Sequence, residues 1–248
     1  MGVSYKNAER LVRTELNFVS NIAAAGPRTC STCSNLNGTI HLLSEFEAGT
    51  NAPPMHPRCR CTISAVVGSG KKVPAGFKRQ QHFSTSNENI SATNPNYSKG
   101  IKYQRNCQRC VPAYEMRMRG YDVVAKPAVI DGIDEFAEYY WDKVFENAII
   151  EKISKGDGKD EIIAKMIEWG DGARAEVYIK WISNDDFGHV FVAENRFGEI
   201  HFLDPQNGTL DVEYYFDTAD NGFTKFFRID NLEPNELFIT ECCKEAAK

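Results

Sequence analysis

The sequence lacks the features that define several large classes of protein. It has no run of about 20 apolar residues, the length that a membrane-spanning helix needs, and it begins without the apolar stretch of a secretory signal. Eight cysteines among 248 residues are too few for a fold built on disulfide bonds. We therefore expect a protein that is made in the cytoplasm, a reducing compartment, and that does not bind a membrane.

The sequence also lacks an excess of positive charge. Its 29 lysines and arginines face 34 acidic residues, for a net charge of −5, which argues against a nucleic-acid partner. The basic residues concentrate in 71–110, where eight basic residues and one acidic residue give +7 and leave −12 for the rest of the chain. Since this stretch overlaps a Gly-, Ser- and Asn-rich segment, we interpret it as a solvated linker; the alternative is a docking patch for an acidic partner.

Composition divides the chain into three predicted parts. Residues 1–67 open with helical spacing of apolar residues over Tyr5–Ala25, followed by a helix stop at Gly26 and a cysteine-rich region. Residues 68–93 form the predicted linker. Residues 94–248 are long enough for one compact domain, and the 42% hydrophobic content of the whole chain is sufficient for one or two cores.

The third part mixes two hydrophobic periods. Helical spacing predicts one helix that ends at Gly120, and two more over Ile133–Ile153 and Glu161–Trp169. A short strand is expected at Tyr121–Ala125, and alternation from Val177 onward predicts three further strands. The fold class is therefore α+β, with helices packed on an antiparallel sheet and a small helical, cysteine-rich module before it.

Two β-rich runs bring a histidine and a carboxylate together. They flank Asn195–Gly198, a four-residue segment typical of a hairpin connection. With that loop His189 pairs directly with Asp204, at a Cβ separation of about 4.5–5.5 Å. Asp204 could then accept the Nδ1–H of His189 and stabilise the imidazolium, as a catalytic histidine requires. The alternative is a structural histidine on a half-buried strand, which is our interpretation of His201.

The motif N-C-Q-R-C opens the helix that ends before Gly120. Asn106 is a suitable N-cap, which would place Cys107 in the first helical turn. Free backbone N–H groups and the helix dipole favour the thiolate form of a cysteine there, and they can also stabilise an oxyanion. This segment therefore predicts a nucleophilic cysteine.

Several alternatives to that assignment stay open. Pro112 favours a helix start near Arg109, which would put Cys110 at the tip instead of Cys107. The pair Cys107-x-x-Cys110 could also be a redox dithiol, half of a zinc site or two buried thiols. A redox pair usually follows a strand in a βαβ unit, which the pattern does not show. We favour Cys107.

A second group of cysteines has the spacing of metal ligands. Cys30 and Cys33 form one pair, and His56 and Cys59 form another, while Cys61 offers an alternative ligand. Thiolates with one imidazole suit tetrahedral zinc. We expect a structural zinc site; uncoordinated thiols or a disulfide are the alternatives. No cofactor is expected for catalysis.

Several motifs in the third part resemble the papain-fold toxin domains of bacterial polymorphic toxins. The motifs are N-P-N-Y at 94–97, N-C-Q-R-C-V-P-A-Y-E-M-R-M-R-G-Y-D-V at 106–123, G-H-V-F-V-A-E-N at 188–195 and F-L-D-P-Q-N-G at 202–208. Some relatives deamidate glutamines of host proteins. The resemblance implies that Cys107 is the nucleophile, His189 the acid and base, and Asp204 its orienting partner. Gln206 matches the D-P-Q motif, with no role that follows from the sequence.

The first part resembles the C-terminal part of phage minor-capsid, head-morphogenesis proteins. The similarity lies in Y-K-N-A-E-R-L-V-R-T-E at 5–15, C-S-T-C-S-N-L-N-G at 30–38 and N-A-P-P-M-H-P-R-C-R-C-T at 51–62. Together the resemblances imply a cysteine hydrolase with a target protein as its substrate, a cognate immunity protein, and capsid or portal partners. They also imply association with a virion or delivery into a target cell. The alternatives are a cysteine protease with the same triad and a structural virion protein with an inactive papain-like domain.

Overall fold

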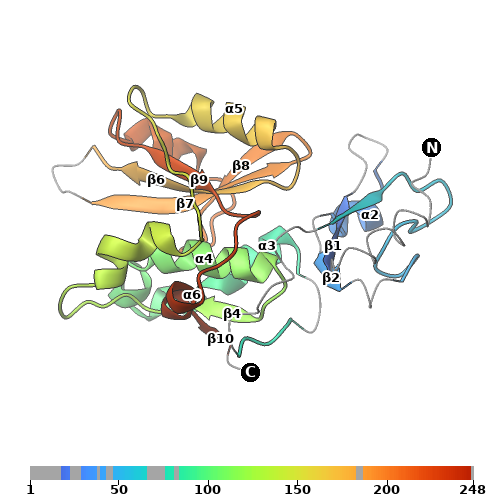
Figure 1. Cartoon of the computed structure of the whole chain (residues 1–248), viewed down its shortest axis with the longest axis horizontal. Helices are drawn as coiled ribbons and strands as arrows, with labels where there is room; N and C mark the ends of the chain where they lie inside the picture. Colours follow the sequence, from blue (N-terminus) through green and yellow to red (C-terminus); the bar gives the residue numbers. More distant parts are fainter. Residues whose placement is uncertain are drawn as a thin grey trace.

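The computed structural model describes residues 18–22, 29–37, 40–42, 47–65, 76–80, 84–182 and 187–246 (Figure 1). Its helices and strands form a small sheet from the first 65 residues and a larger mixed domain from the later ones. The α+β class predicted from the sequence is confirmed. In these ranges no helix combines the length and the apolar character needed to cross a lipid bilayer.

The first part is a three-stranded antiparallel sheet with one short helix. Its central strand pairs on both sides, with Val19 opposite His41 on one neighbour and Ala65 on the other. The elements are β1 (Phe18–Ile22), α2 (Ser31–Asn35), β2 (Ile40–Leu42) and β3 (Thr62–Ala65). The helix predicted over Tyr5–Ala25 is therefore wrong for residues 18–22, because pairing on both edges stabilises the strand over a helix. The rest of that predicted helix lies outside the described residues.

The larger domain is built on a five-stranded antiparallel sheet in the order β5-β9-β6-β7-β8. The alternation predicted from the sequence holds on β7, where Val190 and Val192 enter one buried cluster and Phe191 and Ala193 enter another. The strands are β5 (Glu151–Lys152), β6 (Arg174–Lys180), β7 (Gly188–Arg196), β8 (Glu199–Leu203) and β9 (Lys225–Arg228). Both faces of the sheet are therefore covered.

Helices cover the two faces unequally (Figure 1). On one face α4 packs against β7, α3 and α6, and against the strand pair β4–β10. On the other face α5 and the 3₁₀ helix η6 bury the second apolar cluster. The elements are α3 (Ser86–Thr93), α4 (Cys107–Met118), β4 (Val123–Ala125), α5 (Lys159–Trp169), η6 (Glu213–Thr218), α6 (Glu236–Cys242) and β10 (Cys243–Glu245).

Short helical turns complete the domain. Two 3₁₀ turns precede α4, η2 (Tyr97–Lys99) and η3 (Ile101–Tyr103). The helix predicted over Ile133–Ile153 is wrong: the chain makes a π-helical turn η4 (Phe136–Tyr140) and a 3₁₀ turn η5 (Trp141–Lys143), and then extends into β5. Asn147 has φ of 60°, which ends helical geometry. Near the end of this segment, β5 pairs with β9 instead of continuing a helix.

Part of the predicted linker is ordered against the domain. Residues 86–93 form α3, which starts with a capping box between Thr85 and Glu88 and buries Ile90 in the core beside α4. Gln80 donates hydrogen bonds to the carbonyl groups of Arg117 and Tyr121. The domain boundaries at 67 and 93 stay a prediction.

Candidate functional site

Helix α4 presents Cys107 as its first residue. The helix starts there and includes Pro112, so the alternative start near Arg109 is not adopted. Asn106 occupies the N-cap position, but the prediction that its side chain caps the helix is wrong. That side chain instead donates to the carbonyl of Lys126 at 2.9 Å, where it ties the helix start to the loop after β4.

Gln206 supplies the cap in place of Asn106. The hydrogen-bond pattern orients its carboxamide with the oxygen toward α4, where it accepts from the backbone N–H groups of Cys107 at 2.8 Å and Asn106 at 3.0 Å. Its own backbone is held by Asn94, whose side chain donates to the Gln206 carbonyl at 2.8 Å. The D-P-Q segment is thus attached to the helix that carries the thiol.

A buried ionic cluster fixes α4 on the sheet. Glu115, fully buried, accepts from Arg119 at 2.7 Å and from Arg174 of β6 at 2.6 Å. Burial alone would raise the pKa of Glu115, but the two guanidinium groups lower it below its ordinary value. The carboxylate therefore stays charged and links the helix to the strand.

The β7–β8 hairpin differs in register from the prediction. A two-residue turn at Phe197 and Gly198, both at positive φ, replaces the expected four-residue loop, so Glu194 pairs with His201. The direct pairing of His189 with Asp204 is therefore wrong. Because the shift moves the partner by two residues, Asp204 stays on the same face as His189 and becomes its diagonal neighbour.

His189 and Asp204 are nevertheless hydrogen-bonded. The Nε2 of His189 lies 3.0 Å from an Asp204 carboxylate oxygen, and both residues are buried. The prediction that Nδ1 contacts Asp204 is therefore wrong, because Nε2 occupies this position. Nδ1 is thus the nitrogen left for a second partner.

The side chain of Cys107 lies close enough to the His189 ring to interact with it by charge and by a hydrogen bond. The thiol also donates to the side-chain oxygen of Gln108 at 3.2 Å. Burial lowers the pKa of His189, but the charges and hydrogen bonds of Cys107 and Asp204 outweigh it and raise that pKa to about 10. The negative charge around the ring therefore favours the protonated, imidazolium form of His189.

The two cysteines of the C-x-x-C motif have different surroundings. Cys110, one helical turn after Cys107, is fully buried, and burial with the nearby charge of Cys107 raises the pKa of the Cys110 thiol well above its usual range. It is an inert core residue. Cys242 and Cys243, which look incidental at the end of the sequence, are also buried, and β10 pairs Cys243 with Ala125.

Three functional neighbours are not apparent from the sequence. Trp181 stacks on the His189 ring with centroids 6.0 Å apart, and Tyr215 meets the same ring edge-on at 5.5 Å. Tyr215 also donates to Asp204 at 2.9 Å, and Gln206 caps α4. In the sequence, Tyr215 belongs to the aromatic run at 214–216 and Gln206 to the D-P-Q motif. Neither feature predicts a contact with a distant residue.

Gly188 sets the start of β7 directly before the histidine. A Cβ at this position would lie 2.4 Å from the ring of Tyr178 and 2.6 Å from the carbonyl oxygen of Ile179. Both neighbours belong to β6, which pairs with β7 here. Glycine is therefore required for the two strands to approach at the point where His189 leaves the sheet.

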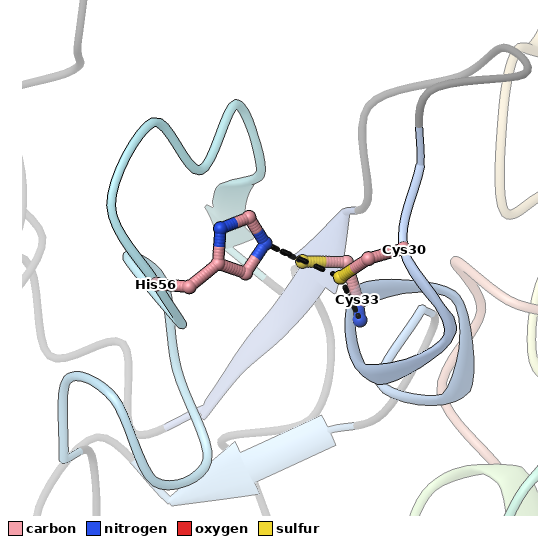
Figure 2. Close-up of side chains that lie close together, drawn as sticks. All are labelled: Cys30, Cys33 and His56. Carbon is pink, nitrogen blue, oxygen red and sulfur yellow. Dashed lines mark hydrogen bonds between the residues drawn. The ribbon is translucent and has the colours of Figure 1, made fainter.

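The cysteines of the first part lie close to one another. His56 Nε2 lies 3.2 Å from Cys30 Sγ and 3.3 Å from Cys33 Sγ, and Figure 2 shows the ring pointing toward both sulfurs. Cys33 Sγ is 3.8 Å from Cys59 Sγ, and Cys61 completes a second group with these two. Ligands of one tetrahedral zinc ion stand roughly 3.5–3.8 Å apart, given the usual Zn–S and Zn–N bond lengths. Both groups could therefore hold a metal ion.

The state of His56 also suits metal binding. Its Nδ1 lies 3.0 Å from the Pro57 carbonyl, which can only accept, so Nδ1 carries a proton and Nε2 is the nitrogen that faces the sulfurs. Cys30 accepts from the backbone N–H of Cys33, which lowers the pKa of Cys30 to about 7. The more buried Cys33 is surrounded by thiols, and its pKa is raised by burial and by these neighbours. A cation would favour the thiolate forms of both.

Two family models match the chain. Residues 105–209 match the model described as "Papain fold toxin 1, glutamine deamidase", and residues 14–64 match "Phage Mu protein F like protein". A search among curated proteins finds no significant match. Both resemblances drawn from the motifs are thereby confirmed. The first segment contains Cys107, His189 and Asp204, whose catalytic roles stay a prediction.

Proposed function

We propose that this chain, which joins a papain-fold toxin domain of the glutamine-deamidase type to a Phage Mu F-like region, converts a glutamine side chain of a target protein to glutamate. The observation that carries the proposal is the convergence of Cys107, His189 and Asp204. Helix α4, strand β7 and the end of β8 contribute one residue each. Such a group is suited to acyl transfer from an amide.

The first half of the reaction forms a thioester. The Cys107 thiolate attacks the carboxamide carbon of the substrate, and the imidazolium of His189 gives its proton to the nitrogen as the C–N bond breaks and ammonia leaves. Asp204 keeps the ring oriented through Nε2. The oxygen of Gln206 already accepts the N–H groups at the helix start, so its NH₂ group is the donor that faces the oxyanion.

The second half releases the product. His189, now neutral, takes a proton from water as the oxygen attacks the thioester carbon. The C–S bond breaks, glutamate leaves and the thiolate–imidazolium pair is restored. Attack on a backbone amide by the same residues would instead make the domain a protease.

Release of ammonia from a target protein tests the proposal. We expect Cys107→Ala and His189→Ala each to reduce the rate by at least about 10³-fold, since they remove the nucleophile and the proton carrier. Cys110→Ala, one turn later on the same helix and fully buried, is the matched control and should keep its activity if circular dichroism shows it folded. Mass spectrometry of the target distinguishes deamidation, which leaves the chain intact, from peptide-bond cleavage. If the wild type forms neither product, that result would support the alternative of a structural virion protein with an inactive papain-like domain.

We also propose a structural zinc ion in the first part, held by Cys30, Cys33, His56 and Cys59, with Cys61 as the alternative fourth ligand. When bound, the ion would cross-link α2 to the loop before β3. Purified protein should contain stoichiometric zinc by elemental analysis. Cys33→Ser should lose it, because Cys33 belongs to both groups.

Ser34→Ala, an exposed neighbour on α2, is the control and should retain the metal. Comparing Cys59→Ser with Cys61→Ser identifies the fourth ligand, since only the true ligand lowers zinc affinity strongly. Zinc content unchanged in Cys33→Ser would contradict the site.

The Phage Mu F-like region supports a route of delivery. We propose that the chain is made in the bacterial cytoplasm and leaves with a phage-related particle through capsid or portal contacts, and that an immunity protein protects the producing cell. Co-purification with such particles tests the first part. Cells that express the wild type should need the immunity protein to grow, whereas cells that express Cys107→Ala should grow without it.

A further inference from the structure

The carboxylate of Asp204 has three hydrogen-bond donors, of which His189 is only one. One oxygen accepts from His189 Nε2 at 3.0 Å and from the hydroxyl of Tyr215 at 2.9 Å. The other accepts from the backbone N–H of Gln206 at 2.8 Å. Since Asp204 is 1% exposed, these contacts define its orientation.

Tyr215 contacts both members of the His–Asp pair. Its ring lies edge-on to the His189 ring, with an interplanar angle of 81°. It also lies edge-on to the ring of Trp181, which itself stacks on the His189 ring at an interplanar angle of 22°. The side chain of Asn207 donates to the Tyr215 hydroxyl at 3.2 Å and orients it. Tyr215 lies on η6, beyond the last residue of the segment that matches the toxin family.

The hydroxyl is suited to remain a donor. Burial and the neighbouring Asp204 charge raise the pKa of Tyr215 above its ordinary value, so the phenol keeps its proton at neutral and moderately alkaline pH. A carboxylate that accepts two bonds on one oxygen divides its negative charge between them. Tyr215 thus limits how strongly Asp204 holds the proton of His189.

We propose that Tyr215 is a positioning residue of this site: its hydroxyl orients Asp204, and its ring keeps the His189 imidazole directed at Cys107. The expected change in kcat rests on the proposed deamidation, whereas the expected orientation of Asp204 and His189 does not. Cys107 of α4 and Asp204 after β8 raise the pKa of His189, while Tyr215 of η6 contacts the His189 ring and the Asp204 carboxylate. Of these two contacts of Tyr215, removing the hydroxyl changes only the second.

Tyr215→Phe tests the hydroxyl while keeping the ring. We expect kcat for ammonia release to fall about 10-fold with little change in KM, because a hydrogen bond to a charged group is lost and substrate contacts are not. The alkaline limb of the pH–rate profile should move to higher pH, because Asp204 then holds the imidazolium more strongly. Tyr214→Phe, the exposed neighbour on η6, is the matched control and should change neither quantity.

A titration of His189 by NMR of the imidazole nitrogens separates this inference from the proposed function. We expect a higher pKa for His189 in folded Tyr215→Phe than in the wild type. That shift in a protein that releases no ammonia would overturn the deamidation and leave the positioning role intact. Active wild-type protein with kcat, alkaline limb and His189 titration all unchanged in Tyr215→Phe would overturn the positioning role.

If Tyr215→Phe does not fold, Asn207→Ala applies the same test from an exposed position. It removes the donor that orients the Tyr215 hydroxyl, so kcat should fall about 2- to 3-fold, in line with a weak neutral hydrogen bond. Unchanged kcat in that variant would count against the proposal.

Discussion

The two cysteine-rich parts of the chain are held together in different ways. Among the side chains that the structure places between residues 29 and 63, only Cys33 and Ala52 are buried. The larger domain instead has two buried apolar clusters, one on each face of its sheet. Within residues 29–63 the close thiols and imidazole could add stability by holding a metal ion.

The same residue type therefore has three roles in one chain. Cysteines of the first part lie close to one another and could serve as metal ligands, while Cys110, Cys242 and Cys243 are core residues of the second part. Cys107 differs from these three because it opens a helix and faces a histidine. Position in the fold, rather than spacing in the sequence, separates these roles.

Removing the metal should give the largest difference between the two parts. Structural zinc contributes about 10–16 kcal/mol of apparent binding free energy in small zinc domains, as much as the whole stability of a typical domain. A chelator should therefore unfold the first part, which limited proteolysis within residues 29–65 would detect. Ammonia release and the Tm of the second part should not change. Loss of both together would show that the two parts fold as one unit.

Removing the buried carboxylate of α4 should have the next largest effect, a loss of stability of the second part. Glu115→Ala leaves Arg119 and Arg174 buried without their partner, which should cost about 3–5 kcal/mol in urea unfolding of the second part. Because the pKa of Glu115 is lowered in the folded state, its contribution is complete above the unfolded value near pH 4.3 and is lost as pH falls through the folded value.

The acid sensitivity of the wild type should therefore be reduced in Glu115→Ala. Glu213→Ala removes an exposed ion pair with Lys159 and is the control, with little expected change. Equal stability of Glu115→Ala and the control would contradict the role of the buried cluster.

A smaller effect of opposite sign is expected at Glu176. This residue of β6 is fully buried, and neither carboxyl oxygen has a hydrogen-bond partner among the described residues. Burial, with the charges of Cys107 and Asp142, raises the pKa of Glu176 well above its ordinary value. Glu176→Met should therefore stabilise the second part by about 1–3 kcal/mol at pH 7.

The gain at Glu176 should depend on pH. With a raised folded pKa, the wild type is least penalised below the unfolded value near pH 4.3 and loses stability as pH rises toward the folded value. Urea unfolding should thus show a larger gain for Glu176→Met at pH 8 than at pH 5. Glu161→Met on the exposed side of α5 is the control. A loss of stability in Glu176→Met at both pH values would indicate that the carboxyl has a stabilising partner.

The sequence predicted what local chemistry determines. Cys107 at a helix start follows from one short motif, and the class of the fold follows from periodicity. The hairpin register was wrong by two residues because a positive φ at Phe197, unusual for a residue other than glycine, permits the shorter turn. His189 and Asp204 still share a face, since an even shift preserves the alternation.

Other features depend on contacts between distant segments. The predicted helix over Ile133–Ile153 failed because β5 is stabilised by β9, some 70 residues later in the chain. Tyr215 and Gln206 reach the site only through the return of the chain after β8. The sequence indicates only one pair of the buried ionic cluster, Glu115 and Arg119, which lie four residues apart on a helix. Nothing in the sequence indicates that Arg174 on β6 joins them.

Gly188 makes the candidate site intolerant of substitution at a position that has no functional side chain. Any larger residue must displace Tyr178 and the β6 backbone, and the imidazole that follows would move with its strand. A saturation-mutagenesis survey scored by toxicity would thus rank this glycine beside the nucleophile. The same survey scored by expression would also find alanine poorly tolerated there, because the added methyl group meets the β6 backbone.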